Sequence, residues 1–234
     1  MRRFLGERWA AVSAIKVAIG LMTVTLVLFA ATFAYFIVAG LNQTQQRLED
    51  RSSAAGQIVA TNAYWITEVA TQTLRRVDAS LGYAMSSSAE IIRLSLTDLP
   101  SVVELYIIDA VGNTIYSTVP GAQDVSVVDR EYFTALEYGA EFFTSSMLES
   151  RLTGDQIFVF SKRVERDGVF AGAIMVSYAN AVLEGLWQTL ELDPGSTISF
   201  VRSDGQLMAR FPPADGPVDL AGMPLFTQHL LNSE

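Results

Sequence analysis

The stretch ELYIIDAVGNTIYST, residues 104–118, decides the fold of this 234-residue chain. Its first half is rich in β-branched and aromatic residues up to Asp109, residues 110–113 have the composition of a turn, and a second short run follows. This pattern predicts a β-hairpin over residues 102–118. Pro100, just before it, separates a helical sequence pattern from a region of short strand patterns.

Three further strands are expected after this hairpin. The turn Arg166-Asp167-Gly168 joins the last two of them into a second hairpin. The three strands are EFFTSS (141–146), QIFVFSKRV (156–164) and VFAGAIMVSYA (169–179). Together with the first hairpin they predict a five-stranded antiparallel sheet.

Two short helices are expected within the same region. DREYFTALEYG (129–139) predicts a helix with Asp129 as its N-cap and with Glu131 favourably placed at the positive end of the helix dipole. A second helix is expected at about 181–192. The predicted fold class over residues 100–192 is therefore α+β, with the helices on one side of the sheet.

The first hairpin has a copy further along the chain. TISFVRSDGQLMARF, residues 197–211, aligns with residues 104–118 without a gap, at a constant offset of 93 residues. Gly112 coincides with Gly205, and apolar residues coincide at Leu105/Ile198, Ile107/Phe200, Ile108/Val201 and Ile115/Met208. A second module of the same kind is therefore expected to begin at 193, and residues 193–234 hold its first hairpin, a Pro/Gly-rich loop and a helix near 225–231.

Residues 17–41 contain no charged side chain and predict a transmembrane helix. Their 25 residues, at about 1.5 Å each, exceed a hydrocarbon core of about 30 Å. A cleaved signal peptide is the alternative, because residues 31–34 have the small-residue spacing of a cleavage site. The apolar run is longer than a typical signal peptide core and continues past Ala34, which favours an uncleaved anchor.

The charge distribution predicts how this helix is oriented. Residues 1–16 form a basic tail with a net charge of +3, which leaves −12 for residues 42–234 of the chain's total of −9. The positive-inside rule then places the N-terminus in the cytoplasm and the bulk of the chain in the periplasm, anchored in a bacterial inner membrane. An acidic exported part without a basic stripe also argues against nucleic acid as a partner.

Residues 42–99 are expected to form one long periplasmic helix. The apolar positions in the second half of this segment advance by three or four residues, with a mean spacing of about 3.7, which is helical. These positions are Ile66, Ala70, Leu74, Val77, Leu81, Met85, Ser88 and Ile92, of which Ser88 is the weak member.

The composition excludes most catalytic and metal sites. With no cysteine and one histidine, His229, the chain cannot build a disulfide framework, a thiolate metal site or a histidine cluster. We find no Walker loop, no Gly-x-Ser-x-Gly and no His-Glu-x-x-His. The prediction is that this chain is not an enzyme and holds no cofactor and no metal.

The region from 103 to 226 resembles the double Cache family of extracytoplasmic sensors. The matching pieces are ELYIIDAVGNTIYST, DREYF, SRLTGDQIFVFSKRV, DGVFAGAIMVSYA and ISFVRSDGQLMARFP. The resemblance implies two stacked PAS-like modules on a long N-terminal helix. It also implies a small-molecule pocket in the membrane-distal module, residues 100–192, and assembly as a parallel homodimer.

The same resemblance implies a ligand-binding role for the helix at 129–139. Arg130 would grip a ligand carboxylate, because a planar guanidinium binds carboxylates bidentately, and Tyr132 and Phe133 would shape the pocket. The alternative is purely structural. In that case Asp129 caps the helix, the two aromatics enter the core and Arg130 is solvated.

Four further residues complete the expected site. Arg151 and Thr153, in the loop facing this helix, would supply a second positive charge and a hydroxyl, or else form an ordinary surface turn. Lys162, one of two lysines, would point into the pocket or into water according to strand phase. Ser177 matches the position at which amino-acid-sensing members carry an aspartate, so the expected ligand is an organic acid, such as a small mono- or dicarboxylate.

The resemblance implies that the chain is the ligand-sensing part of a transmembrane receptor. The usual outputs of such receptors are a histidine kinase, a diguanylate cyclase or a chemoreceptor, and the output module is expected beyond Glu234. The alternative is a stand-alone, membrane-anchored periplasmic binding or interaction protein without signalling output. The receptor is favoured because an unfinished second module would expose sheet edges.

Overall fold

The computed structural model divides into two units, residues 1–54 and 55–234, which are treated separately. It describes residues 2–82, 85, 103–122, 125–190, 195–214, 216, 218–224 and 226–227, with side chains from residue 15 onward except at 42 and 44–50. The expected helical positions Ser88 and Ile92, and most of the expected helix near 225–231, lie outside these residues.

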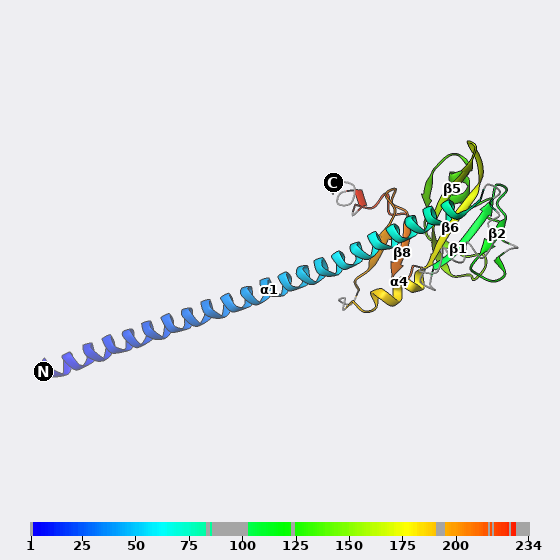
Figure 1. Ribbon diagram of the computed structural model, residues 1–234. Coiled ribbons are helices and arrows are strands. Elements are labelled where there is room, and N and C mark those ends of the chain that lie inside the picture. The colour runs from blue at the N-terminus through cyan, green and yellow to red at the C-terminus, as the bar shows by residue number, and fades with distance from the viewer. Residues whose placement is uncertain are drawn as a thin grey trace. The chain divides into compact units, whose positions relative to one another are not determined.

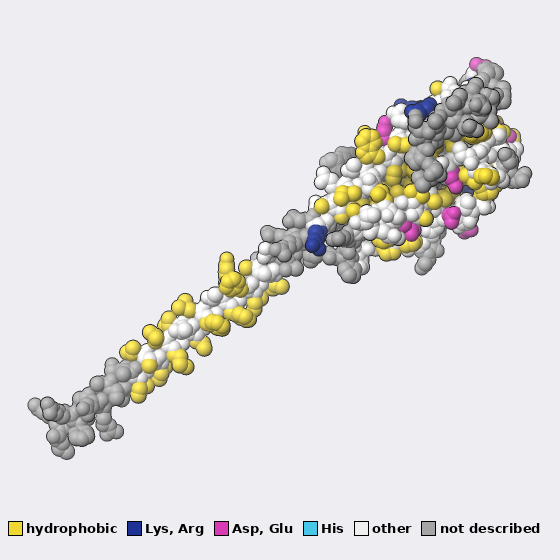
Figure 2. All heavy atoms as spheres, turned by 60° about the horizontal axis from the view of Figure 1, so that its bottom comes forward, with side chains coloured by type: hydrophobic (Ala, Val, Ile, Leu, Met, Phe, Trp, Pro, Cys, Tyr) yellow, Lys and Arg dark blue, Asp and Glu magenta, His cyan; other side chains and the backbone are white. Residues whose placement is uncertain are grey.

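Helix α1, Arg2–Ser80, begins in the first unit and continues into the second (Figure 1). Its stretch Ile15–Leu41 has a mean hydropathy of 2.3 and is long and apolar enough to cross a membrane. Figure 2 shows apolar side chains along this stretch, and none of the window is buried within the chain. Such a surface is suited to lipid.

The second unit buries the C-terminal part of α1. Ala70, Leu74, Val77 and Leu81 belong to the core, as their helical spacing predicts. Helix α1 ends at Ser80, so the expected helix over 42–99 is not continuous at Leu81, Gly82 and Met85; the rest of that range lies outside the described residues. Gly82, two residues after Ser80, has a low helix propensity, which disfavours continuation of the helix.

The second unit contains the predicted antiparallel sheet. Its strands are β1 Val103–Asp109, β2 Thr114–Ser117, β3 Phe142–Thr144, β4 Leu148–Glu149, β5 Gln156–Arg166 and β6 Val169–Ala179. They lie in the order β2-β1-β6-β5-β3, and the two-residue β4 also pairs with β5. The five expected strands are thus confirmed, with β4 as a short addition.

Two short helices follow the predicted order. Helix α3, Glu131–Glu137, has Arg130 at its N-cap with no side-chain cap, so the expected cap by Asp129 is wrong. The Asp129 carboxylate instead accepts a hydrogen bond from Arg151. Helix α4, Asn180–Trp187, is shorter than the expected 181–192.

These helices cover both faces of the sheet. Phe158 and Phe160 of β5 share a core with α1 and α4, whereas the alternating residues Ile157 and Val159 share one with α3. The expectation of helices on one side is therefore wrong. Strands β5 and β6 are apolar at successive positions, and a strand of that kind requires cover on both faces.

The hairpin that repeats residues 104–118 consists of β7 Ile198–Val201 and β8 Leu207–Phe211 and forms a separate two-stranded sheet. The 93-residue offset extends to its backbone details. Gly112 and Gly205 have φ values of +88° and +91°, and each accepts a hydrogen bond, from Val127 N at 2.9 Å and from Leu220 N at 2.8 Å.

The repeat continues to the start of the next helix. Phe133 N and Thr134 N donate to Arg130 O, and at the same offset Phe226 N and Thr227 N donate to Met223 O, all at 3.0 Å. The hairpin and these turn contacts within the described residues of 198–227 thus match those from β1 to the first turn of α3.

Candidate functional site

A cavity of about 40 Å³ lies between α3 and the sheet. Its walls come from β1, β2, β5 and β6, from the N-terminal end of α3 and from the loop that follows β4. The polar and charged residues that line it are Tyr106, Thr114, Arg130, Tyr132, Ser150, Arg151 and Ser177. Apolar side chains such as Val159 and Met175 form the remainder.

The N-terminus of α3 supplies two of the expected residues. Arg130 lines the cavity, and its guanidinium donates through Nη2 to Glu149 O at 2.9 Å. Tyr132 also lines it, and burial raises the pKa of Tyr132 to about 12, so its hydroxyl is a neutral hydrogen-bonding group at physiological pH. Phe133 lies in the core instead, 1% exposed and with its ring edge-on to Phe170.

Arg151 reaches the cavity from the opposite loop. Its guanidinium donates to Ser126 O at 2.6 Å and to the Asp129 carboxylate. The hydrogen bond from Arg151 lowers the pKa of Asp129 below its usual value. Thr153 is not a lining residue in the described structure; its hydroxyl accepts from Asp155 N at 3.3 Å within the loop.

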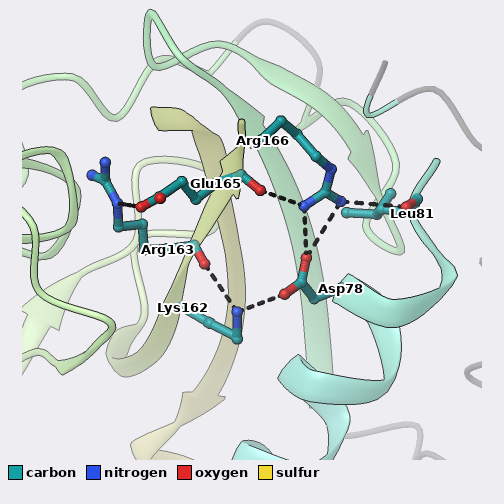
Figure 3. Close-up of polar contacts among 6 residues, drawn as sticks. All are labelled: Asp78, Leu81, Lys162, Arg163, Glu165 and Arg166. Atoms are coloured by element: carbon teal, nitrogen blue, oxygen red, sulfur yellow. Dashed lines mark hydrogen bonds and ion pairs between the residues drawn. The ribbon is translucent and has the colours of Figure 1, made fainter. Parts of the chain in front are cut away.

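Lys162 lies on the other face of the sheet. Figure 3 shows its ammonium group pointing toward Asp78 of α1, with Nζ 2.6 Å from Asp78 Oδ2. Arg166 also approaches Asp78, at 3.3 Å. Strand phase therefore places Lys162 away from the cavity, and the structure gives it a position next to α1.

Ser177 lines the cavity and is hydrogen-bonded to Glu104, an acid that the sequence analysis did not include in the site. Its hydroxyl donates to Glu104 Oε2 at 2.9 Å, and the Tyr106 hydroxyl donates to the same oxygen at 2.8 Å. Burial and the Glu104 carboxylate raise the pKa of Tyr106 well above its usual range. The alternation of Glu104 and Tyr106 on one face of a predicted strand was a signal that could have found this acid.

Comparisons with known proteins identify the fold. No protein-family model and no curated protein matches the chain. Among solved structures, the extracellular domain of rpHK1S-Z16, a protein assigned as a histidine kinase, is 26% identical with a TM-score of 0.65, over 82% of this chain and 80% of that one. The fold is that of a Cache-type sensor domain.

Two chemoreceptors share the same Cache-type fold at lower identity. The ligand-binding domain of Campylobacter jejuni Tlp3, solved with L-valine, is 14% identical with a TM-score of 0.55, over 81% of each chain. That of Pseudomonas fluorescens CtaA, solved with L-isoleucine, is 16% identical with a TM-score of 0.52, over 72% of this chain and 70% of that one. At these identities the likeness concerns the fold alone.

The Cache-type domain has a second and larger hollow, of about 480 Å³. It lies between α1, β5 and the β7–β8 hairpin, and its lining residues are mostly apolar, including Val59, Ile66, Phe158 and Phe200. No charged side chain lines it, so it lacks the groups that would fix a polar ligand.

The smaller cavity is therefore the candidate ligand site of the Cache-type domain. Within the described part of the chain, no group of three His, Asp or Glu side chains is arranged to hold a metal ion. The arrangement of two arginines and several hydroxyl groups around apolar side chains, with the Glu104 carboxylate bound to two of those hydroxyls, is suited to reversible binding.

Proposed function

We propose that the cavity beside α3 binds a small molecule that carries a carboxylate, and that this binding is the signal the domain senses. Arg130 carries the proposal. It comes from the N-cap of α3, lines the cavity, and uses one of its N–H groups for Glu149 O among the contacts of the described residues. Its remaining donors are available for a bidentate contact with a carboxylate.

Arg151 adds a second positive charge, from the loop that follows β4. Its pairing with Asp129 is exposed, with side chains 39% and 62% accessible, so the exchange of this partner for a ligand carboxylate has a small cost. The two arginines thus provide a fixed and an exchangeable contact.

Glu104 is relevant to whether the ligand also carries an ammonium group. An organic acid was expected because Ser177 stands where an aspartate would face an ammonium group. In this structure Ser177 is paired directly across the sheet with Glu104 and hydrogen-bonded to it, so a carboxylate is present beside the cavity. Both an organic acid and an amino acid with its ammonium group toward Glu104 fit this arrangement.

We propose that binding acts on a conformational equilibrium of the domain. The cavity beside α3 is small, about 40 Å³, and most of its walls are side chains. A ligand that binds one conformation of these walls more tightly than another shifts the equilibrium toward that conformation, and that shift is the signal.

The membrane context of this function follows from α1. We propose that residues 1–16 lie in the cytoplasm, that 17–41 span the inner membrane of a bacterium, and that the sensor domain lies in the periplasm as part of a parallel homodimer. The basic tail and the apolar stretch Ile15–Leu41 support this orientation.

We further propose that residues 100–192 form the membrane-distal module and 193–234 the start of a second one, supported by the 93-residue repeat of backbone contacts. A histidine kinase is the favoured output, because the 26% identical relative is the extracellular domain of a protein assigned to that class. A diguanylate cyclase output, and a stand-alone binding protein without output, are the alternatives.

Titration calorimetry of the detergent-solubilised chain tests the proposal. The panel consists of succinate, propionate, L-isoleucine and γ-aminobutyrate, with isobutanol and isobutylamine as ligands that lack a carboxylate. At least one carboxylate is expected to bind, and the two controls are expected not to. Binding of the controls as tightly as the acids would contradict a carboxylate-directed site.

A further inference from the structure

The last turn of α1 is held to β5 by an ion-pair cluster, here named the Asp78 clamp, which consists of Asp78, Lys162 and Arg166. The Asp78 carboxylate accepts from Lys162 Nζ at 2.6 Å and from Arg166 Nη1 at 3.3 Å (Figure 3). Arg166 also donates to Leu81 O at 3.3 Å, just beyond the helix end. The side chains of Lys162 and Asp78 are only 12% and 22% exposed, so solvent screens this attraction less than at an open surface.

Arg163, the next residue on β5, makes the corresponding contact on the other face of the sheet. Its guanidinium donates to Leu136 O at 2.6 Å and to Glu137 O at 3.1 Å, the last carbonyls of α3. A cation at this position adds a donor to these carbonyls and complements the negative end of the helix dipole. Helix α3 is the same helix whose N-terminal end carries Arg130 and Tyr132 in the cavity.

The backbone between the two side chains is fixed within the sheet. Lys162 is paired with Phe142 of β3 and with Ile174 of β6, and Arg163 N donates to Glu141 O at 2.9 Å. Because β3 and β6 hold this part of β5 on both sides, we expect the backbone of Lys162 and Arg163 to shift as one rigid segment. Their two side chains, which lie on opposite faces of the sheet, would shift with it. Any displacement of α3 that pulls on Arg163 therefore also acts on Lys162.

We propose that Lys162 and Arg163 form a relay that couples the position of α3, at the ligand cavity, to the last turn of α1, the helix that carries the apolar stretch Ile15–Leu41. This inference rests on the proposed ligand-sensing function and adds the route by which occupancy reaches α1. Lys162 and Arg163 are thus positioning residues that do not touch the ligand. The relay requires an energetic coupling between the two helices, and such coupling acts equally in both directions.

Hydrogen exchange of the ligand-free chain tests this reciprocity. Asp78→Asn weakens the clamp on the α1 face, and Arg163→Met removes the contact on the α3 face. The expected result is that Asp78→Asn speeds exchange of the α3 amides of Thr134 and Tyr138, and that Arg163→Met speeds exchange of the α1 amides around Val77. The expected increase is about three- to tenfold, measured relative to the β5–β6 ladder, which reports any global loss of stability.

Glu68→Gln is the matched control for Asp78→Asn, because Glu68 lies on the same helix and its described hydrogen bond is with Gln72 of that helix. It is expected to leave α3 unchanged. If Arg163→Met does not fold, Arg163→Lys keeps the charge on a shorter side chain without the planar guanidinium, and it is expected to give the same remote effect at smaller size. Variants that alter exchange only in the helix they contact would overturn the relay. Because no ligand is used, this result is independent of whether a carboxylate binds.

Discussion

Glu104 and Ser177 face each other across β1 and β6 and are joined by a hydrogen bond of 2.9 Å, at the wall of the candidate cavity. The Tyr106 hydroxyl donates to the same carboxylate oxygen at 2.8 Å. Two residues that line the cavity, Tyr106 and Ser177, thus hold a half-buried acid in place behind its wall. This network keeps a negative charge close to a site whose other side carries two arginines.

The network predicts a non-additive effect on stability. Tyr106→Phe and Ser177→Ala each remove one hydrogen bond to a charged group, so each is expected to lower the free energy of unfolding by about 1.5–3 kcal/mol. The double variant is expected to lose more than the sum, because Glu104 then has neither partner. Denaturant unfolding measures all three values.

Tyr116→Phe is the control for this experiment, since its hydroxyl makes no hydrogen bond that the structure describes. It is expected to change the unfolding free energy by no more than about 0.5 kcal/mol. Strict additivity of the two site variants would show that Glu104 does not link them.

Gly112→Ala is expected to destabilise the first hairpin more than Gly121→Ala. Both residues have positive φ values, +88° and +82°, so each alanine carries a backbone cost of about 1–2 kcal/mol. At Gly112 the added Cβ would also lie 2.8 Å from Val128 Cβ, whereas at Gly121 nothing lies within 4 Å. Thermal unfolding compares the two, and equal losses would argue against the close approach of the chain at Gly112.

Phe133→Ala is expected to cost about 3–5 kcal/mol, because this side chain of α3 is buried against the sheet. Tyr138→Ala, five residues on and 86% exposed, is the matched control and is expected to be near neutral. Chemical denaturation measures both. A small loss of unfolding free energy in Phe133→Ala, combined with a change in ligand affinity, would indicate that Phe133 lines the cavity.

Asp129 predicts the pH dependence of the cavity mouth. The hydrogen bond from Arg151 lowers the pKa of Asp129, so the folded carboxyl titrates below the unfolded one. The stabilising contribution of the pair is therefore complete above the ordinary aspartate value of about 3.9, and it is lost as the pH falls through the lower folded pKa. Between pH 5 and 8 the pair stays intact.

Carbon-13 NMR titration of the Asp129 carboxyl checks this expectation. The pKa is expected to lie below the usual value in the wild-type chain and to return toward it in Arg151→Met. An Asp129 pKa that is the same in both proteins would contradict the contact.

The sequence predicted the elements well because most signals were local. The hairpin at residues 104–118, the strands around Phe158 and Ile174, and the helix that begins after Arg130 all have the turn residues and apolar periods of their elements. The offset between Gly112 and Gly205 was also readable, and it extends to matching turn hydrogen bonds.

The site was harder to predict because side-chain direction depends on strand phase and on partners distant in sequence. Lys162 points toward α1 because the even-numbered residues of β5 face that side, and its partner Asp78 is 84 residues away. Asp129 binds Arg151 rather than capping its own helix. Glu104 reaches Ser177 only through the pairing of β1 with β6, which no local pattern contains.

The central claim is that Arg130 holds a ligand carboxylate, and its direct test is the dissociation constant of the tightest carboxylate of the panel for Arg130→Ala and for Arg210→Ala. Arg210 lies on β8 and is not among the residues that line the cavity, so it controls for loss of a positive charge. The account predicts that Arg130→Ala weakens binding about 10- to 100-fold, equivalent to about 1.5–3 kcal/mol, while Arg210→Ala leaves it unchanged. An unchanged dissociation constant for Arg130→Ala would contradict the account and leave Arg130 as the N-cap residue of α3.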